Sequence, residues 1–152
     1  MENKEEIVGY VANVYQGWSS STISLFFTTN RVIVAKILGS GTNVGSYFAG
    51  GVIGGALAAK HSQNKTAEFK ALSPEIILSK DKKNYAVPYS EIIQIKMKKP
   101  GTFSGGHVEI KATNGEQKFK LTNKGAFEVN KYDFSFVPNL PSTVRDKIVM
   151  EN

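Results

Sequence analysis

The stretch TISLFFTTNRVIVAKIL, residues 22–38, contains two β-rich runs separated by a short polar segment. Its first part has apolar residues at every second position, which is typical of a β-strand: Ile23, Leu25 and Phe27. Thr29-Asn30 separates this run from a second β-rich run at 31–38, and Asn tolerates the backbone angles of a tight turn. The stretch therefore predicts a β-hairpin.

A second hairpin is predicted at 107–122. Two alternating runs there flank Asn114-Gly115, the preferred pair for a two-residue type I′ turn. This turn would pair residue 113 with residue 116 across the hairpin. The cross-strand pairs that follow are Ile110–Phe119, Val108–Leu121, Glu109–Lys120 and Lys111–Lys118.

The other segments give weaker signals. Alternation within 6–18 and over 91–99 predicts strands, and Tyr85–Pro88 reads as a short extended run. Ser73-Pro74 is a helix-start signal, although a strand remains an alternative for the residues that follow. The segment 123–138 reads either as irregular packing or as another strand. Residues 139–150 predict a terminal amphipathic helix with an apolar stripe: Leu140, Val144 and Ile148.

Two stretches are similar to the pleckstrin-homology superfold, in its bacterial and archaeal PH-like and GRAM-like branch. They are LFFTTNRVIVAK at 25–36 and YAVPYSEIIQIKMKK at 85–99. The resemblance implies a mainly β fold: a PH-like antiparallel β-barrel or sandwich, closed by a C-terminal amphipathic helix. It also implies a non-enzymatic scaffold that binds lipid headgroups, peptides or other proteins. The resemblance supports the fold more strongly than the function.

Composition argues against catalysis. The chain of 152 residues has no cysteine and two histidines, which excludes thiol chemistry and leaves little for metal or acid–base sites. It has no P-loop and no complete dinucleotide fingerprint, and Ser19–Ser21 lacks partners at a known triad spacing. We therefore predict no enzyme, no cofactor and no metal.

A Gly-rich apolar insert, 39–66, does not fit a minimal PH-like domain. It lies within a single domain, 1–152, and no charged residue occurs between Lys36 and Lys60. If it is helical, small residues form a stripe that lets another backbone approach closely: Gly50, Gly51, Gly54, Gly55 and Ala58. The stripe could pack on its own chain, on a second copy or on a membrane. Its apolar part is too short for a convincing membrane span.

Positive charge is concentrated rather than spread. Residues 80–99 hold six lysines against two acidic residues, most of the formal net charge of +6. With the predicted hairpin, one sheet face would collect several lysines. The candidate anion- or lipid-binding residues are Lys82, Lys83, Lys96, Lys98, Lys99, Lys111, Lys118 and Lys120. The alternative is a solvated face that only aids solubility.

These features lead to one interpretation and one alternative. The first is a cytoplasmic binding module, peripheral at the membrane, that associates with acidic phospholipid or an acidic protein. Nucleic acid is disfavoured because the aromatic residues occupy core positions. The acidic N-terminus, MENKEEIVGY, lacks the apolar segment of a secretory signal. The alternative is a structural homo-oligomer that uses the insert as its interface.

Overall fold

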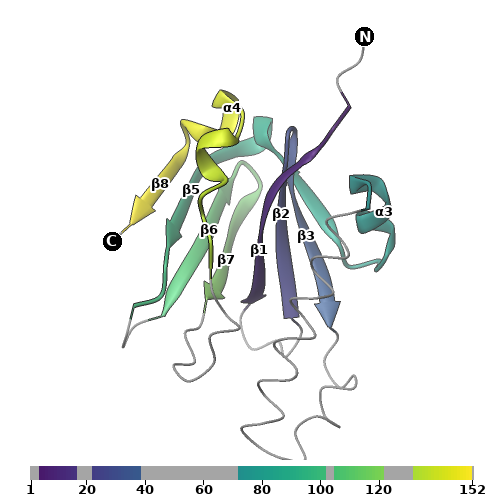
Figure 1. The fold of residues 1–152 in the computed structure, drawn as a ribbon, viewed down its shortest axis with the longest axis horizontal. Coiled ribbons are helices and arrows are strands. Elements are labelled where there is room, and N and C mark those ends of the chain that lie inside the picture. The colour runs from purple at the N-terminus through teal and green to yellow at the C-terminus, as the bar shows by residue number, and fades with distance from the viewer. Residues whose placement is uncertain (1–3, 17–21, 39–71, 102–104, 122–131, 152) are drawn as a thin grey trace, which may run out of the picture.

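The computed structural model describes residues 4–16, 22–38, 72–101, 105–121 and 132–151 (Figure 1). They form a mainly β fold, one mixed and largely antiparallel open sheet with short helices, as the sequence predicts in outline. The eight strands are β1 (Ile7–Tyr15), β2 (Thr22–Thr28), β3 (Arg31–Leu38), β4 (Tyr85–Pro88), β5 (Ile92–Lys98), β6 (Gly106–Ala112), β7 (Gly115–Leu121) and β8 (Ile148–Glu151).

The strand order is β4-β3-β2-β1-β7-β6-β5-β8, and the β5–β8 pair is the parallel one. Two antiparallel runs, β1–β4 and β5–β7, meet where β1 pairs with β7 through Val14↔Leu121 and Tyr15↔Lys120. The described strands therefore do not close into the predicted barrel, because β4 and β8 stand at the two ends of their order and do not pair with each other. The hairpin predicted at 22–38 is confirmed as β2 and β3.

The main core draws on both halves of the sheet. Leu25, Phe27 and Val32 from the first run belong to the same buried cluster as Ile95 and Phe119 from the second. A smaller cluster lies on the other face of β2 and β3, against helix α3 (Pro74–Ser79), and it contains Phe26, Ile33, Ala35, Ile37 and Ile77. Strand β2 is consequently buried along its whole length, which explains why LFF is a continuous apolar run.

Helix α3 settles the alternative left open after Ser73. Ser73 is its N-cap, Pro74 stands in its first turn, and the Ser73 side chain accepts a hydrogen bond from the Ile76 N–H at 3.4 Å. Ile77 is buried against the β2–β3 pair, whereas Ile76 is largely exposed. The helix covers a sheet face that would otherwise expose Phe26 and Ile33.

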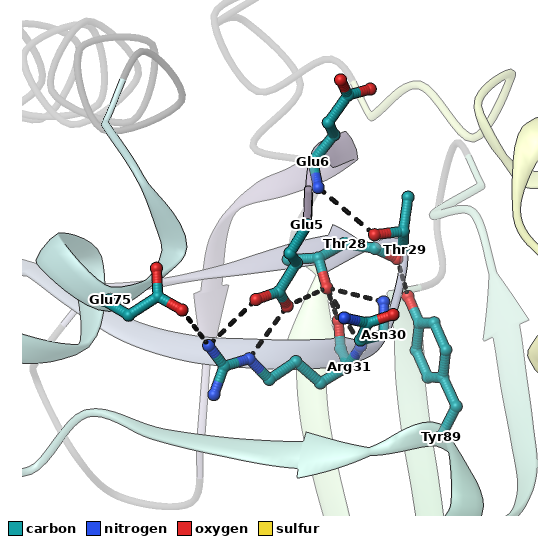
Figure 2. A network of polar contacts seen from close by, with 8 residues as sticks. All are labelled: Glu5, Glu6, Thr28, Thr29, Asn30, Arg31, Glu75 and Tyr89. Atoms are coloured by element: carbon teal, nitrogen blue, oxygen red, sulfur yellow. Dashed lines mark hydrogen bonds and ion pairs between the residues drawn. The ribbon is translucent and has the colours of Figure 1, made fainter. Parts of the chain in front are cut away.

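A polar network fixes the turn between β2 and β3 (Figure 2). The buried Thr28 hydroxyl accepts from the N–H groups of Asn30 and Arg31 at 3.0 Å each and lies 2.6 Å from Glu5 Oε1. The Arg31 guanidinium bonds both oxygens of Glu5, and it also reaches Glu75 of α3 at 3.2 Å. The network ties the N-terminal segment, the hairpin turn and α3 together, so the TTNR sequence has a structural role here.

The network also includes Tyr89, in the short 3₁₀ helix η2 (Tyr89–Glu91) between β4 and β5. Its hydroxyl donates to the Thr28 carbonyl at 2.5 Å. Burial raises the pKa of Tyr89 above its ordinary 10.0, and the charge of Glu5 raises it further. Tyr89 therefore remains a neutral hydrogen-bond donor across the physiological range.

The register predicted for the β6–β7 hairpin is wrong by two residues. Ala112 pairs with Gly115, so Thr113-Asn114 forms the turn, and Gly115 takes the positive φ of 147°. The cross-strand pairs become Glu109↔Lys118 and Lys111↔Glu116 in place of the expected Lys111–Lys118 contact. Opposite charges thus replace like charges, which favours this register. Because the shift is two residues, every side chain keeps its predicted face.

The predicted terminal helix over 139–150 is also wrong in its extent. A 3₁₀ helix, η4 (Val137–Asn139), and one helical turn, α4 (Ser142–Arg145), precede β8, which pairs in parallel with β5. Leu140 and Val144 are buried in the main core, as their spacing indicates. The β-branched pair Ile148-Val149 instead extends the sheet, because β5 offers a free edge for backbone hydrogen bonds.

The alternation at 91–99 predicts Ile93 on the same apolar side as Ile95 and Met97, but Ile93 faces solvent. The ladder with β6 is irregular between Ile92 and Gln94, and this β-bulge leaves Ile93 52% exposed while Ile92 is buried. Beyond the bulge the predicted alternation holds, with Ile95 and Met97 buried. Residues 132–138 pack irregularly rather than as a strand, and they bury Phe134 and Phe136.

Candidate functional site: the lysine face

Three neighbouring strands carry the candidate site. We call the outer side of β5, β6 and β7 the lysine face; its lysines are Lys96, Lys98, Lys111, Lys118 and Lys120. The opposite side of the same strands packs Ile95, Met97, Val108, Ile110 and Phe119 into the core. Side-chain alternation along each strand therefore holds these lysines outward on a rigid support.

The ladder orders the face into rows that cross the strands. In the first row, Lys98 pairs with His107, which pairs with Lys120. In the second row, Lys96 pairs with Glu109, which pairs with Lys118. Neighbouring strands lie about 5 Å apart, so the two lysines of each of these rows are about 10 Å apart, on either side of the central residue.

The third row holds Gln94, Lys111 and Glu116. Lys111 faces a carboxylate across the hairpin, and both side chains are exposed. The sequence correctly indicates that Lys96, Lys98, Lys111, Lys118 and Lys120 share one face, although it does not give their partners.

Acidic side chains neutralise part of this charge. Lys118 Nζ lies 3.2 Å from Glu109 Oε1, and His107 Nε2 lies 2.5 Å from Glu151 Oε1. The hydrogen bond from His107 lowers the pKa of Glu151, and the charges of His107, Lys96 and Lys98 lower it further. Glu151 reaches the face from β8, and sequence reasoning missed it because residues 139–150 read as a helix.

Four of the five lysines of the lysine face form no salt bridge with any residue that the structure describes. Among the described residues, Lys96, Lys98, Lys111 and Lys120 form no ion pair. Two of them, Lys98 and Lys120, flank His107 on either side in the first row. The β5–β8 ladder adds Glu151 beside Lys98 to this row, so the first row combines two ammonium groups with a carboxylate that is already hydrogen-bonded to His107.

His107, Glu109 and Glu151 also satisfy the spacing of a metal site, since their ligand atoms all lie within 4.8 Å of one another. The surroundings do not suit a cation. Lys98 lies in the ladder between His107 and Glu151. The Lys118 ammonium already forms a salt bridge with the Glu109 carboxylate. We interpret the three residues as part of an ion-pair network that sets the charge of the face.

The other candidate lysines lie elsewhere. Lys82 and Lys83 are exposed in the turn between α3 and β4, at the opposite end of the strand order from β5. Lys99 follows β5, and its Nζ lies 5.7 Å from the centre of the Phe134 ring, a cation–π contact. The structure thus does not place Lys82, Lys83 or Lys99 in the rows of the lysine face.

The predicted association stripe of Gly50, Gly51, Gly54, Gly55 and Ala58 lies outside the described residues, as do His61 and Ser19–Ser21. No helix in the described part of the chain is both long enough and apolar enough to cross a membrane. No family model, curated protein or solved structure matches this sequence.

Proposed function

We propose that the chain is a non-enzymatic, PH-like binding module whose lysine face associates with an anionic membrane surface. The PH-like part of the proposal is supported by two antiparallel runs over one core and by the hairpin turn built from TTNR. It is also supported by Leu140 and Val144, which fill the core before the last strand. These are features of a scaffold, so the function has to be argued from the face itself.

The observation that carries the function is the set of four lysines on one rigid face that form no salt bridge with any described residue. An exposed lysine near an anionic bilayer contributes about 1 kcal/mol to binding. Lysines spread over a sheet face can contact many headgroups of a membrane surface, whereas a single ligand would need an enclosed pocket. Glu109, Glu116 and Glu151 limit the affinity, so binding should be weak and strongly salt-dependent.

The test is flotation with vesicles that contain phosphatidylserine, compared with neutral phosphatidylcholine vesicles. The double change Lys96→Glu with Lys98→Glu should weaken binding by at least about thirty-fold, because two favourable contacts are lost and two repulsive ones are added. The matched control is Lys82→Glu with Lys83→Glu, which alters net charge equally away from the face. Circular dichroism checks that both variants fold.

Two results would count against the proposal. One is the absence of binding to acidic vesicles at low salt. The other is equal loss of binding in both double variants, since that would reflect net charge alone. Association through the insert, the alternative function, would instead appear as a change in mass that Gly51→Leu or Gly54→Leu removes without affecting flotation.

A further inference from the structure

The two strands at the ends of the described order, β4 and β8, are protected against further pairing to different degrees. Strand β4 is four residues long and ends in Pro88, which has no N–H to offer a further strand. Strand β8 has no proline, and it exposes Val149 by 41% and Met150 by 51%. Figure 1 shows β8 at the outer side of β5, and it is the last strand in the order.

The pairing with β5 determines which backbone groups of β8 remain free. Ile95 N donates to the Lys147 carbonyl at 2.9 Å, and Ile95 is the ladder partner of Ile148. Alternate residues of a strand direct their N–H and C=O groups to opposite edges, so residues 147, 149 and 151 face β5. The N–H and C=O groups of Ile148 and Met150 therefore face away from β5, on the side of β8 where no described strand pairs.

We propose that a second copy of this chain pairs antiparallel along β8, about a two-fold axis at Val149. This register pairs Ile148 with Met150 of the other copy, twice, and gives a partner to the four backbone groups of each copy that no described strand pairs. On the core side Met150 packs against the second Ile148. On the outer side the two Val149 side chains meet.

Charge distinguishes this register from its neighbours. With the axis at Val149, Glu151 lies opposite the second copy's Lys147, and this pair occurs twice. A different register that still aligns the core faces of the two copies breaks both pairs, and the one with its axis at Glu151 brings two carboxylates together. The edge is thus self-complementary in hydrogen bonds, apolar contacts and charge, which is what an isologous dimer needs.

The short edge predicts a weak dimer. A stable complex of ordinary size buries about 1,600 Å², and two four-residue strands supply far less. Sedimentation equilibrium of the full chain across a wide concentration range should therefore show a reversible monomer–dimer equilibrium. A chain that stays monomeric at every concentration would overturn the proposal.

A charge swap tests the register. Lys147→Glu places two carboxylates opposite each other across the dimer, and Glu151→Lys places two ammonium groups opposite each other. Each single variant should weaken self-association about tenfold. An equimolar mixture of the two variants should dimerise again, because both cross-strand pairs then join a carboxylate to an ammonium group. A mixture that stays monomeric contradicts this register.

The Lys147→Glu change also removes a hydrogen bond within the chain, because Lys147 Nζ donates to the Tyr89 carbonyl at 2.9 Å. A second variant therefore tests the β8 edge without that loss. Met150→Pro removes an N–H that faces away from β5 and leaves the hydrogen bonds to β5 in place. It should abolish dimerisation while the circular dichroism spectrum is retained. A folded Met150→Pro chain that dimerises like the wild type excludes the β8 edge and directs attention to the insert at 39–66.

Discussion

At the scale of single residues, Thr28 has the most consequential polar side chain in the described part of the fold. Its buried hydroxyl accepts hydrogen bonds from the N–H groups of Asn30 and Arg31 and also bonds the Glu5 carboxylate. Thr28→Val keeps the shape and removes these bonds, so we expect the free energy of unfolding to fall by about 1–3 kcal/mol. Urea denaturation measures this.

Thr29→Val is the matched control for Thr28→Val. The Thr29 hydroxyl accepts one bond, from the exposed Glu6 N–H at 3.2 Å, and water can replace it. We therefore expect a change well below that of Thr28→Val. Equal losses in the two variants would mean that the network in Figure 2 does not hold the turn.

Glycine spacing in the sequence did not reveal a tight contact at the start of β6. A Cβ on Gly106 would lie 2.2 Å from the Lys98 carbonyl oxygen and 2.6 Å from Pro100 N, so backbone would have to move. We expect Gly106→Ala to destabilise the chain by about 1–3 kcal/mol in thermal or urea unfolding. Gly105→Ala meets nothing closer than 3.5 Å and should be tolerated. Equal stability of the two variants would show that the backbone at Gly106 does not approach residues 98–100 this closely.

At the scale of elements, strand β8 should respond to acid. The His107 hydrogen bond lowers the pKa of Glu151 below its ordinary 4.5, so the ionised form is favoured in the folded chain. The stabilisation is fully present above pH 4.5 and is lost as pH falls through the lowered pKa of the folded state. Nuclear magnetic resonance titration should give Glu151 a pKa below 4.5 that rises in His107→Ala. An unchanged Glu151 pKa in His107→Ala would show that the contact does not form in solution.

Sequence patterns predicted the elements unevenly, for identifiable reasons. Strands β1, β2, β5, β6 and β7 follow from alternation, β3 follows from a β-rich run after a short turn, and α3 follows from its Ser-Pro start. The stripe at Leu140, Val144 and Ile148 fits a helix, but the backbone hydrogen bonds offered by β5 turn its last member into a strand residue. The Asn114-Gly115 rule placed the turn one residue late, because cross-strand charge pairing outweighs the local turn preference.

The candidate site was predictable only in part. Side-chain parity survives a two-residue register error, so the five lysines of the face could be grouped from sequence. Their neutralising partners could not, because the Glu109–Lys118 pair depends on the register and Glu151 arrives on a strand that read as a helix. Lys82, Lys83 and Lys99 are close to the face in sequence number and are placed elsewhere by the topology.

At the scale of the whole molecule, the net charge of +6 is less informative than its arrangement. The two-fold axis of the proposed dimer would be perpendicular to the extended sheet. The lysine faces of the two copies would therefore lie on the same side of it. Dimerisation should then increase vesicle affinity through simultaneous engagement. Met150→Pro should accordingly bind acidic vesicles more weakly than the wild type, although it changes no lysine. If Met150→Pro and the wild type bound the vesicles with equal affinity, dimerisation would not contribute to membrane binding.

The proposed function depends on the outer side of β5, β6 and β7 being the surface that meets anionic lipid. Paramagnetic relaxation from a spin-labelled headgroup in acidic nanodiscs locates that surface, because the broadening of each backbone amide reports its distance from the bilayer. We expect the strongest broadening around Lys96, Lys98 and Lys120, and little around α3 and β4. Broadening confined to α3 and β4, or none at low salt, would contradict the assignment of the lysine face.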